Sequence, residues 1–205
     1  MCRGVLCLVD RDYEDCCPNV KPNSYLVFTD VNSLEAYALF PSVVEKFLLV
    51  ALGGFPLSKR TVMDVIDRIL TRLYAIRVTN ERLGWGMSWI PFTRYVSLTK
   101  ESIALREADF LRSYLQKNHR WDSSKEFAAA LSETTAQLPT DIGRRIRGHD
   151  LADLMLLLVN RFRKERKFGN VETIEGSLLA TIEAADLDDS VLFRRIVALG
   201  QEGQG

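Results

Sequence analysis

The sequence lacks a long hydrophobic run and has no excess of charge of either sign. The apolar run Phe47–Leu52 is far shorter than the roughly 20 residues that cross a bilayer, and the residues after Met1 do not have the order of a signal peptide. We therefore expect a cytoplasmic protein with no membrane partner. Lys plus Arg and Asp plus Glu both total 27, so any nucleic-acid site must be a local patch.

Cysteine is also scarce, with four residues in 205. Cys16 and Cys17 are adjacent, and Cys2 and Cys7 lie in or before an apolar segment, so their spacing does not match a zinc ribbon. Free cysteine usually behaves as a small hydrophobic residue, and we assign these four no redox or metal function. Apolar residues at 47% and charged residues at 26% are typical of a folded domain.

Two short apolar segments near the N-terminus predict β-strands. Gly4–Val9 is a continuous apolar run that ends at a polar cluster, and Tyr25–Thr29 is a second run that ends at Asp30. Continuous apolar runs are typical of strands that are buried on both faces, as in a parallel or mixed sheet. We therefore expect two neighbouring strands with acidic residues at their carboxyl ends.

After the second strand the apolar residues recur at helical spacing. Pro41 is expected in the first turn of a new helix, and Ser58 or Thr61 is placed to cap the next one. The predicted helical segments are 62–73, 107–115, 124–131, 150–162, 171–184 and 190–199. The predicted fold class is therefore α/β, with an α/β part over residues 1–45 and a mostly α-helical region over residues 46–205 packed on it.

The polar cluster after the first strand contains a candidate metal site. Asp10 and Asp12 are two residues apart, so both side chains leave the strand end on the same side. Glu35 follows the second strand at a strand-to-helix junction, and in a parallel sheet it would reach the same edge. Such carboxylates favour Mg²⁺ or Mn²⁺ and phosphodiester chemistry. We therefore predict Asp10, Asp12 and Glu35 as metal ligands and catalytic residues.

An Asp-x-Asp pair alone has several interpretations. It occurs in sugar-nucleotide transferases, in haloacid-dehalogenase-type phosphatases, in Toprim domains and at solvated strand ends. Tyr13 departs from the phosphatase pattern, which usually has a small hydroxyl residue or valine there. A nucleotide-sugar or phosphate-transferring enzyme that uses the same pair is a further alternative. The sequence offers no sugar or nucleotide pocket for it. Ser58–Thr61 resembles a phosphate loop only superficially, because glycine does not precede Lys59.

Three segments match a known pattern: Leu8–Tyr13, Thr29–Tyr37 and, more weakly, Ile146–Leu151. With these segments the chain resembles the Toprim domains of the overcoming-lysogenization-defect nucleases, and a related family of unknown function encoded beside anti-phage ATPases. The resemblance implies a Toprim-like fold and a Mg²⁺-dependent nuclease that cuts DNA or RNA. It also implies a role in bacterial anti-phage defence with an ATPase partner protein. By this resemblance, Asp10 and Asp12 are the Toprim aspartate pair.

The chain departs from the Toprim pattern at its N-terminus. Toprim domains usually begin with a strand that ends in a glutamate upstream of the aspartate pair, whereas only Met1–Arg3 precede Gly4. That glutamate usually serves as a metal ligand or a general acid or base. By the resemblance, Glu35 corresponds to a different acid, the one that follows the next strand in the overcoming-lysogenization-defect nucleases. The resemblance thus leaves three possibilities: a shortened gene product, a site that a partner completes, or a truncated or degenerate binding and effector subunit without catalytic turnover.

Basic residues supply the candidates for nucleic-acid binding. These candidates are Arg11, Arg144, Arg145, Arg147 and His149. They could contact phosphates, and His149 could also protonate a leaving group. The alternative for the segment Arg144–Asp150 is an exposed helix start with Asp150 as its cap. The basic run Arg161–Lys167 could bind a nucleic-acid backbone or complement a helix C-terminus. The aromatic residues within 85–92 are expected to pack in the core rather than to stack on bases.

Overall fold

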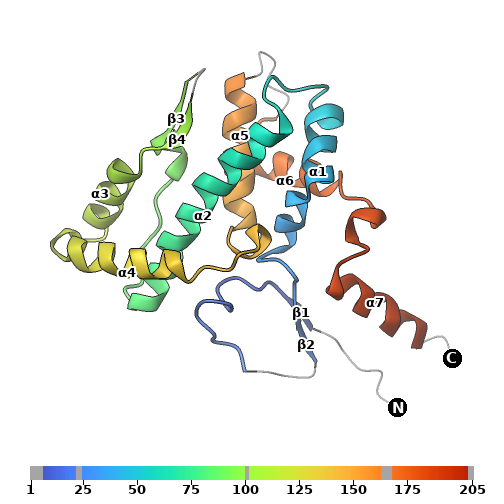
Figure 1. The fold of residues 1–205 in the computed structure, drawn as a ribbon, viewed down its shortest axis with the longest axis horizontal. Coiled ribbons are helices and arrows are strands. Elements are labelled where there is room, and N and C mark those ends of the chain that lie inside the picture. Colours follow the sequence, from blue (N-terminus) through green and yellow to red (C-terminus); the bar gives the residue numbers. More distant parts are fainter. Residues whose placement is uncertain (1–6, 22–24, 100–101, 163–167, 203–205) are drawn as a thin grey trace.

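Helices dominate the structure, and the chain also forms two small two-stranded sheets (Figure 1). The computed structural model describes residues 7–21, 25–99, 102–162 and 168–202. It has 61% helix and confirms the predicted mixed α/β class. The strands are β1 (Cys7–Val9), β2 (Leu26–Phe28), β3 (Val96–Leu98) and β4 (Ile103–Leu105). The α-helices are α1 (Pro41–Lys46), α2 (Lys59–Leu83), α3 (Glu107–Lys117), α4 (Ser124–Ala136), α5 (Gly148–Phe162), α6 (Val171–Leu179) and α7 (Val191–Glu202). Shorter helical segments are the 3₁₀ turns Leu34–Leu39, Phe92–Tyr95, Trp121–Ser123, Ile142–Arg144 and Ala184–Leu187, and the π-helix Phe47–Ala51.

β1 and β2 pair in parallel, with Leu8 opposite Val27, which confirms the predicted parallel pairing. The predicted burial of the first strand on both faces is wrong, because Cys7 is exposed and Leu8 is 47% exposed. The sheet lies at one end of the helical body (Figure 1), so the helices cover it incompletely. Residues 4–6 of the predicted strand lie outside the described residues.

α2 runs through the middle of the helical body, and its sequence explains both of its ends (Figure 1). Ser58 caps the N-terminus as predicted, because its hydroxyl accepts a hydrogen bond from the Thr61 backbone N at 3.1 Å. Gly84 ends the helix with a left-handed φ of 62°, a conformation that glycine adopts without steric cost. The helix packs against α1, α4 and α5 through its buried apolar residues. These include Val62, Val65, Ile66, Ile69, Leu70 and Leu73.

The aromatic stretch after α2 packs in the core, as predicted. Phe92 is buried, and the Trp89 ring lies 5.2 Å from the ring of Phe110. The Trp85 ring lies 5.7 Å from the ring of Phe127. The antiparallel hairpin of β3 and β4 that follows has no counterpart among the predicted elements. Each of its strands contains only three residues, too few to show a clear alternating pattern.

The later helices occupy the predicted segments but differ from some of them in length, since α4 continues to Ala136 beyond the predicted end at residue 131. Pro41 opens α1 as expected, and α3, α4, α5 and α7 overlap the segments predicted for them. α6 ends at Leu179 rather than near Ala184. Glu183 and Asp186 form a capping box that begins a separate 3₁₀ turn, which explains the early end of the helix. Across the described residues, each helix is either too short or too polar to span a bilayer.

Asp186 ties the C-terminal part of the chain to α1. Its carboxylate accepts hydrogen bonds from Ser42 Oγ at 2.6 Å and from Lys46 Nζ at 2.7 Å. The bond from Lys46 is the main cause that lowers the pKa of Asp186 to about 2. Because folding lowers this pKa, the carboxylate adds stability at neutral pH that is lost as the pH falls from the unfolded value of 3.8 to about 2.

We expect Asp186→Asn to remove this part of the acid dependence. Between about pH 4 and about pH 2, the free energy of unfolding should fall more steeply for the wild type than for the variant, because only the wild type loses an ionised Asp186. Urea unfolding followed by circular dichroism at several pH values measures both slopes. Asp122→Asn, at an exposed position, is the matched control. Equal slopes in the wild type and Asp186→Asn would contradict the prediction.

Candidate metal centre

The segments that follow β1 and β2 meet at the carboxyl edge of the sheet. Asp10 follows β1, and its Oδ1 accepts a hydrogen bond from the Leu34 backbone N at 3.2 Å. The backbone N of Asp12 donates a hydrogen bond to the carbonyl oxygen of Asn32 at 2.9 Å. These bonds hold the acidic segment after β1 against the segment that carries Glu35, as expected for adjacent parallel strands.

Two glycines allow the segment after β2 to lie directly against the residues that lead into α5. A Cβ atom on Gly143 would lie 2.6 Å from Cγ1 of Val31, and one on Gly148 would lie 2.5 Å from both Cβ and Oε2 of Glu35. The backbone N of Gly148 also donates a hydrogen bond to Ser33 Oγ at 3.2 Å. Only glycine leaves room for these approaches. Gly148 therefore determines how closely Glu35 approaches α5.

Glu35 lies beside His149 and Glu175, which come from the first turn of α5 and from the middle of α6. In the described part of the chain, these three residues form a group whose possible ligand atoms all lie within 4.8 Å of one another. His149 Nδ1 is 2.6 Å from Glu175 Oε1. One imidazole and two carboxylates at this spacing can coordinate a single divalent cation.

The charges at this edge of the sheet act on one another. Partial burial raises the pKa of Asp10, and the neighbouring carboxylates of Glu35 and Asp12 raise it further. The hydrogen bond with Glu175 raises the pKa of His149. Several carboxylates therefore repel one another here, and a bound divalent cation would relieve that repulsion because it supplies opposite charge.

The predicted ligands Asp10, Asp12 and Glu35 all lie at this edge. Asp12 is exposed and has a left-handed φ of 45°, which aspartate tolerates better than most residues. Among the described residues, neither aspartate belongs to the group of ligand atoms within 4.8 Å. Metal coordination by Asp10 and Asp12 stays a prediction, and Glu35 is the residue shared by the predicted set and the observed group.

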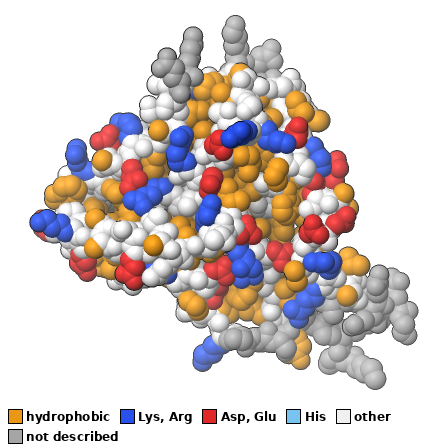
Figure 2. All heavy atoms as spheres, in the orientation of Figure 1, with side chains coloured by type: hydrophobic (Ala, Val, Ile, Leu, Met, Phe, Trp, Pro, Cys, Tyr) orange, Lys and Arg blue, Asp and Glu red, His pale blue; other side chains and the backbone are white. Residues whose placement is uncertain are grey.

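Three of the arginines predicted to bind nucleic acid are bonded within the protein. Arg11, Arg144 and Arg145 donate hydrogen bonds to oxygens of the chain at 2.9, 3.1 and 2.9 Å. By contrast, the Arg147 side chain has no hydrogen bond or ion pair with a described residue. On the face shown in Figure 2, basic and acidic side chains are interspersed rather than gathered by sign. Residues 163–167 of the basic run lie outside the described residues.

Asp150, next to His149, forms a buried ion pair that the sequence did not reveal. Its carboxylate accepts hydrogen bonds from Nε and Nη2 of Arg77 at 3.0 and 2.9 Å. The Arg77 guanidinium also lies 3.5 Å from the centre of the Trp89 ring. In place of the helix cap considered from the sequence, Asp150 thus joins α5 to α2. This ion pair fixes the first turn of α5, which carries His149.

Glu175 is the member of the group that sequence reasoning missed. It is one of two glutamates in α6, and no motif marks it. Its side chain is 18% exposed and contacts His149, whereas Glu172 one turn earlier is exposed. The available signal was its place beside the buried residues Ile174 and Leu178, which puts it near the inner face of the helix.

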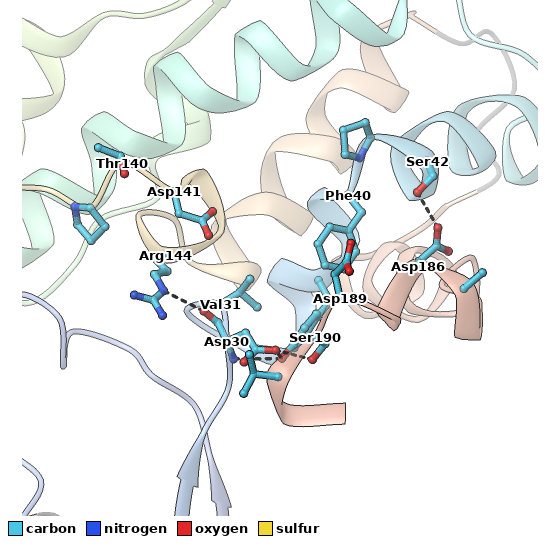
Figure 3. Close-up of a pocket in the computed structure, with 15 residues that line it drawn as sticks. Asp30, Val31, Phe40, Ser42, Thr140, Asp141, Arg144, Asp186, Asp189 and Ser190 are labelled. Atoms are coloured by element: carbon cyan, nitrogen blue, oxygen red, sulfur yellow. Dashed lines mark hydrogen bonds between the residues drawn. The ribbon is translucent and has the colours of Figure 1, made fainter. Parts of the chain in front are cut away.

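A pocket of about 740 Å³ lies between the segment after β2 and the start of α7 (Figure 3). Asp30 lines it, and the Asp30 carboxylate accepts hydrogen bonds from the Leu192 backbone N at 3.2 Å and from the hydroxyl of Ser190. The carbonyl oxygen of Asp30 accepts a hydrogen bond from Arg144. The bonds from Leu192 and Ser190 attach the start of α7 to the end of β2, and the bond from Arg144 attaches the 3₁₀ turn Ile142–Arg144 to the same place.

No family model, no curated protein and no solved structure matches the chain. The Toprim resemblance therefore depends on the sequence segments Leu8–Tyr13, Thr29–Tyr37 and, more weakly, Ile146–Leu151.

Proposed function

We propose that the chain is a Toprim-like nuclease that uses Mg²⁺ or Mn²⁺ to cleave DNA or RNA. One observation carries the proposal: Asp10 and Glu35 lie together at the carboxyl edge of two parallel strands, where Asp10 accepts a hydrogen bond from Leu34. Carboxylates in this position suit the hard cation that phosphodiester chemistry requires. Arg147, two residues before His149, is available to contact a substrate phosphate.

The proposed reaction is hydrolysis of a phosphodiester. A cation held by Asp10, Asp12 and Glu35 would lower the pKa of a bound water and neutralise charge on the phosphate oxygens. The water oxygen would form a bond to phosphorus and give up a proton, the bond from phosphorus to the leaving oxygen would break, and the leaving oxygen would take up a proton, so that each cleavage consumes one water. The acids therefore position the cation, and Arg147 orients the phosphate beside it.

We expect Asp10→Asn and Glu35→Gln each to lower the rate of cleavage by about 100-fold or more, because each removes a charge that holds the cation. Both changes preserve side-chain size. Labelled single-stranded DNA, double-stranded DNA and RNA, each with Mg²⁺ and with Mn²⁺, serve as substrates, and chelation of the metal should abolish wild-type cleavage. Asp122 is exposed and lies far from Asp10 and Glu35 in the sequence, so Asp122→Asn should cleave like the wild type. Unchanged rates in both site variants would contradict the proposed site.

A second function, a binding or effector subunit without turnover, is favoured by the internal bonding of Arg11, Arg144 and Arg145. Of the five residues predicted to bind nucleic acid, Arg147 and His149 then remain to contact its phosphates. Metal binding without cleavage of any substrate would support this alternative and contradict the nuclease. In both forms of the proposal the chain works with an ATPase partner in anti-phage defence, as the family resemblance implies. Purified ATPase that fails to co-elute with the chain would contradict that partnership.

A further inference from the structure

We infer that Glu35, His149 and Glu175 bind a first-row transition-metal dication in preference to Mg²⁺. The inference shares Glu35 with the proposed nuclease site and rests on that proposal for its biological role. It adds Glu175, which no sequence motif marked, and it names the class of metal. Metal binding itself does not require that the chain cleave nucleic acid, so the two ideas can fail separately.

The three side chains come from separate parts of the chain and meet at one point. Glu35 belongs to the 3₁₀ turn after β2, His149 to the first turn of α5 and Glu175 to α6. Their possible ligand atoms lie within 4.8 Å of one another. Ligand atoms about 2.1 Å from one tetrahedral ion stand roughly 3.4 Å apart. Small side-chain rotations therefore suffice to close the group around an ion.

Close contacts and hydrogen bonds hold the backbone that carries these three ligands. Gly148 lies so close to Glu35 that a Cβ atom there would be 2.5 Å from it, and Asp150 is bonded twice to Arg77 behind His149. The side chain of Asn170 caps α6 by accepting a hydrogen bond from the backbone N of Thr173, two residues before Glu175. Ligands held on such a backbone lose little conformational entropy when a metal binds.

The chemistry of the three ligands selects the metal. Imidazole nitrogen suits Fe²⁺, Ni²⁺, Cu²⁺ and Zn²⁺, and carboxylates suit Mn²⁺, whereas Mg²⁺ prefers oxygen ligands only and keeps several waters. Two glutamates supply two negative charges, which balance the charge of a divalent ion when His149 is neutral. Three protein ligands also leave one position open for a water molecule or a substrate oxygen, as in catalytic metal sites.

The test is metal binding to the full chain in the absence of substrate. Mn²⁺ is the probe, because Zn²⁺ could bind the free thiols of Cys16 and Cys17. We expect isothermal titration to give a Kd for Mn²⁺ at least about tenfold below that for Mg²⁺. Electron spin echo modulation of bound Mn²⁺ should show the nitrogen of a coordinated histidine. A wild type that binds neither ion, or shows no nitrogen signal, would overturn the inference.

Variants separate this site from other metal-binding groups. Glu175→Gln and His149→Phe should each weaken Mn²⁺ binding at least about tenfold, and His149→Phe should remove the nitrogen signal. The matched controls are Glu172→Gln, exposed on the same helix, and His119→Asn, at the other histidine; both should bind like the wild type. Asparagine suits position 119 because His119 has a left-handed φ of 55°. Circular dichroism confirms that each variant is folded.

The same variants distinguish this inference from the nuclease proposal. Mn²⁺ binding that depends on His149 and Glu175, in a chain that cleaves nothing, would overturn the nuclease and support the metal centre. Mg²⁺-dependent cleavage that is lost in Asp10→Asn, together with Mn²⁺ binding that is unchanged in His149→Phe and Glu175→Gln, would overturn the metal centre and support the nuclease.

Discussion

Asp150→Ala is expected to lower the free energy of unfolding by about 3–5 kcal/mol, because it leaves a buried guanidinium without its partner. The Arg77 and Asp150 side chains are only 12% and 5% exposed. Arg77 also lies over the face of Trp89, so it cannot turn to solvent without losing that contact as well. Urea unfolding followed by circular dichroism measures the change.

Two further variants show whether this effect comes from the unpaired charge. Asp109→Ala breaks an ion pair with Arg106 in which both side chains are about half exposed, and it should cost less than about 1 kcal/mol. The double variant Arg77→Met with Asp150→Leu removes both charges and should recover most of the lost stability. An Asp150→Ala chain within about 1 kcal/mol of the wild type would show that the pair contributes little.

Gly148→Ala is expected to lower the free energy of unfolding by about 3 kcal/mol, and to weaken Mn²⁺ binding at the same time. The added Cβ would lie 2.5 Å from Cβ and Oε2 of Glu35 and 2.6 Å from Ser33 Oγ. Glu35 Cβ is attached to the backbone, so the backbone itself must move to admit the methyl group. The displaced Glu35 would then leave His149 and Glu175 with one ligand fewer.

The control for this substitution is another helical glycine. A Cβ atom on Gly176 of α6 would have no neighbour within 4 Å, so Gly176→Ala should raise stability by about 0.4–1 kcal/mol. Gly148→Ala should therefore change the unfolding free energy in the opposite direction from Gly176→Ala. Two stabilised chains with normal Mn²⁺ affinity would show that the close approach of Gly148 and Glu35 is not required.

Local pattern was enough to predict the main elements of the fold. The apolar runs before Asp10 and Asp30 marked both strands of the parallel sheet, and helical periodicity with the Ser58 cap marked α2. Burial of β1 was overestimated, because the sequence does not say how many neighbours cover a sheet. The strands of the β3–β4 hairpin are three residues long, which is too short for a period to predict them. The division at residues 45 and 46 stays a prediction.

The candidate site could be predicted only in part, for a physical reason. Asp10 and Glu35 follow strands directly, and the geometry of parallel strands brings such residues to one edge. Glu175 and Arg77 lie within helices, and their positions depend on how those helices pack against α5. Long-range packing of this kind leaves no trace at a fixed sequence spacing. The same holds for the hydrogen bond from Arg11 to the carbonyl oxygen of Thr29, which depends on a partner across the sheet.

The contact between Asp30 and α7 has a consequence for the order of folding. The hydrogen bond from the Leu192 backbone N to Asp30 joins positions that are 162 residues apart. Closing so long a loop costs entropy that local helix formation does not, so contacts of this kind tend to form late. We therefore expect the helical body around α2 to assemble first and α7 to dock on the strand end afterwards. The acidic edge of the sheet would then be among the last parts of the chain to reach its native order, and among the first to open again.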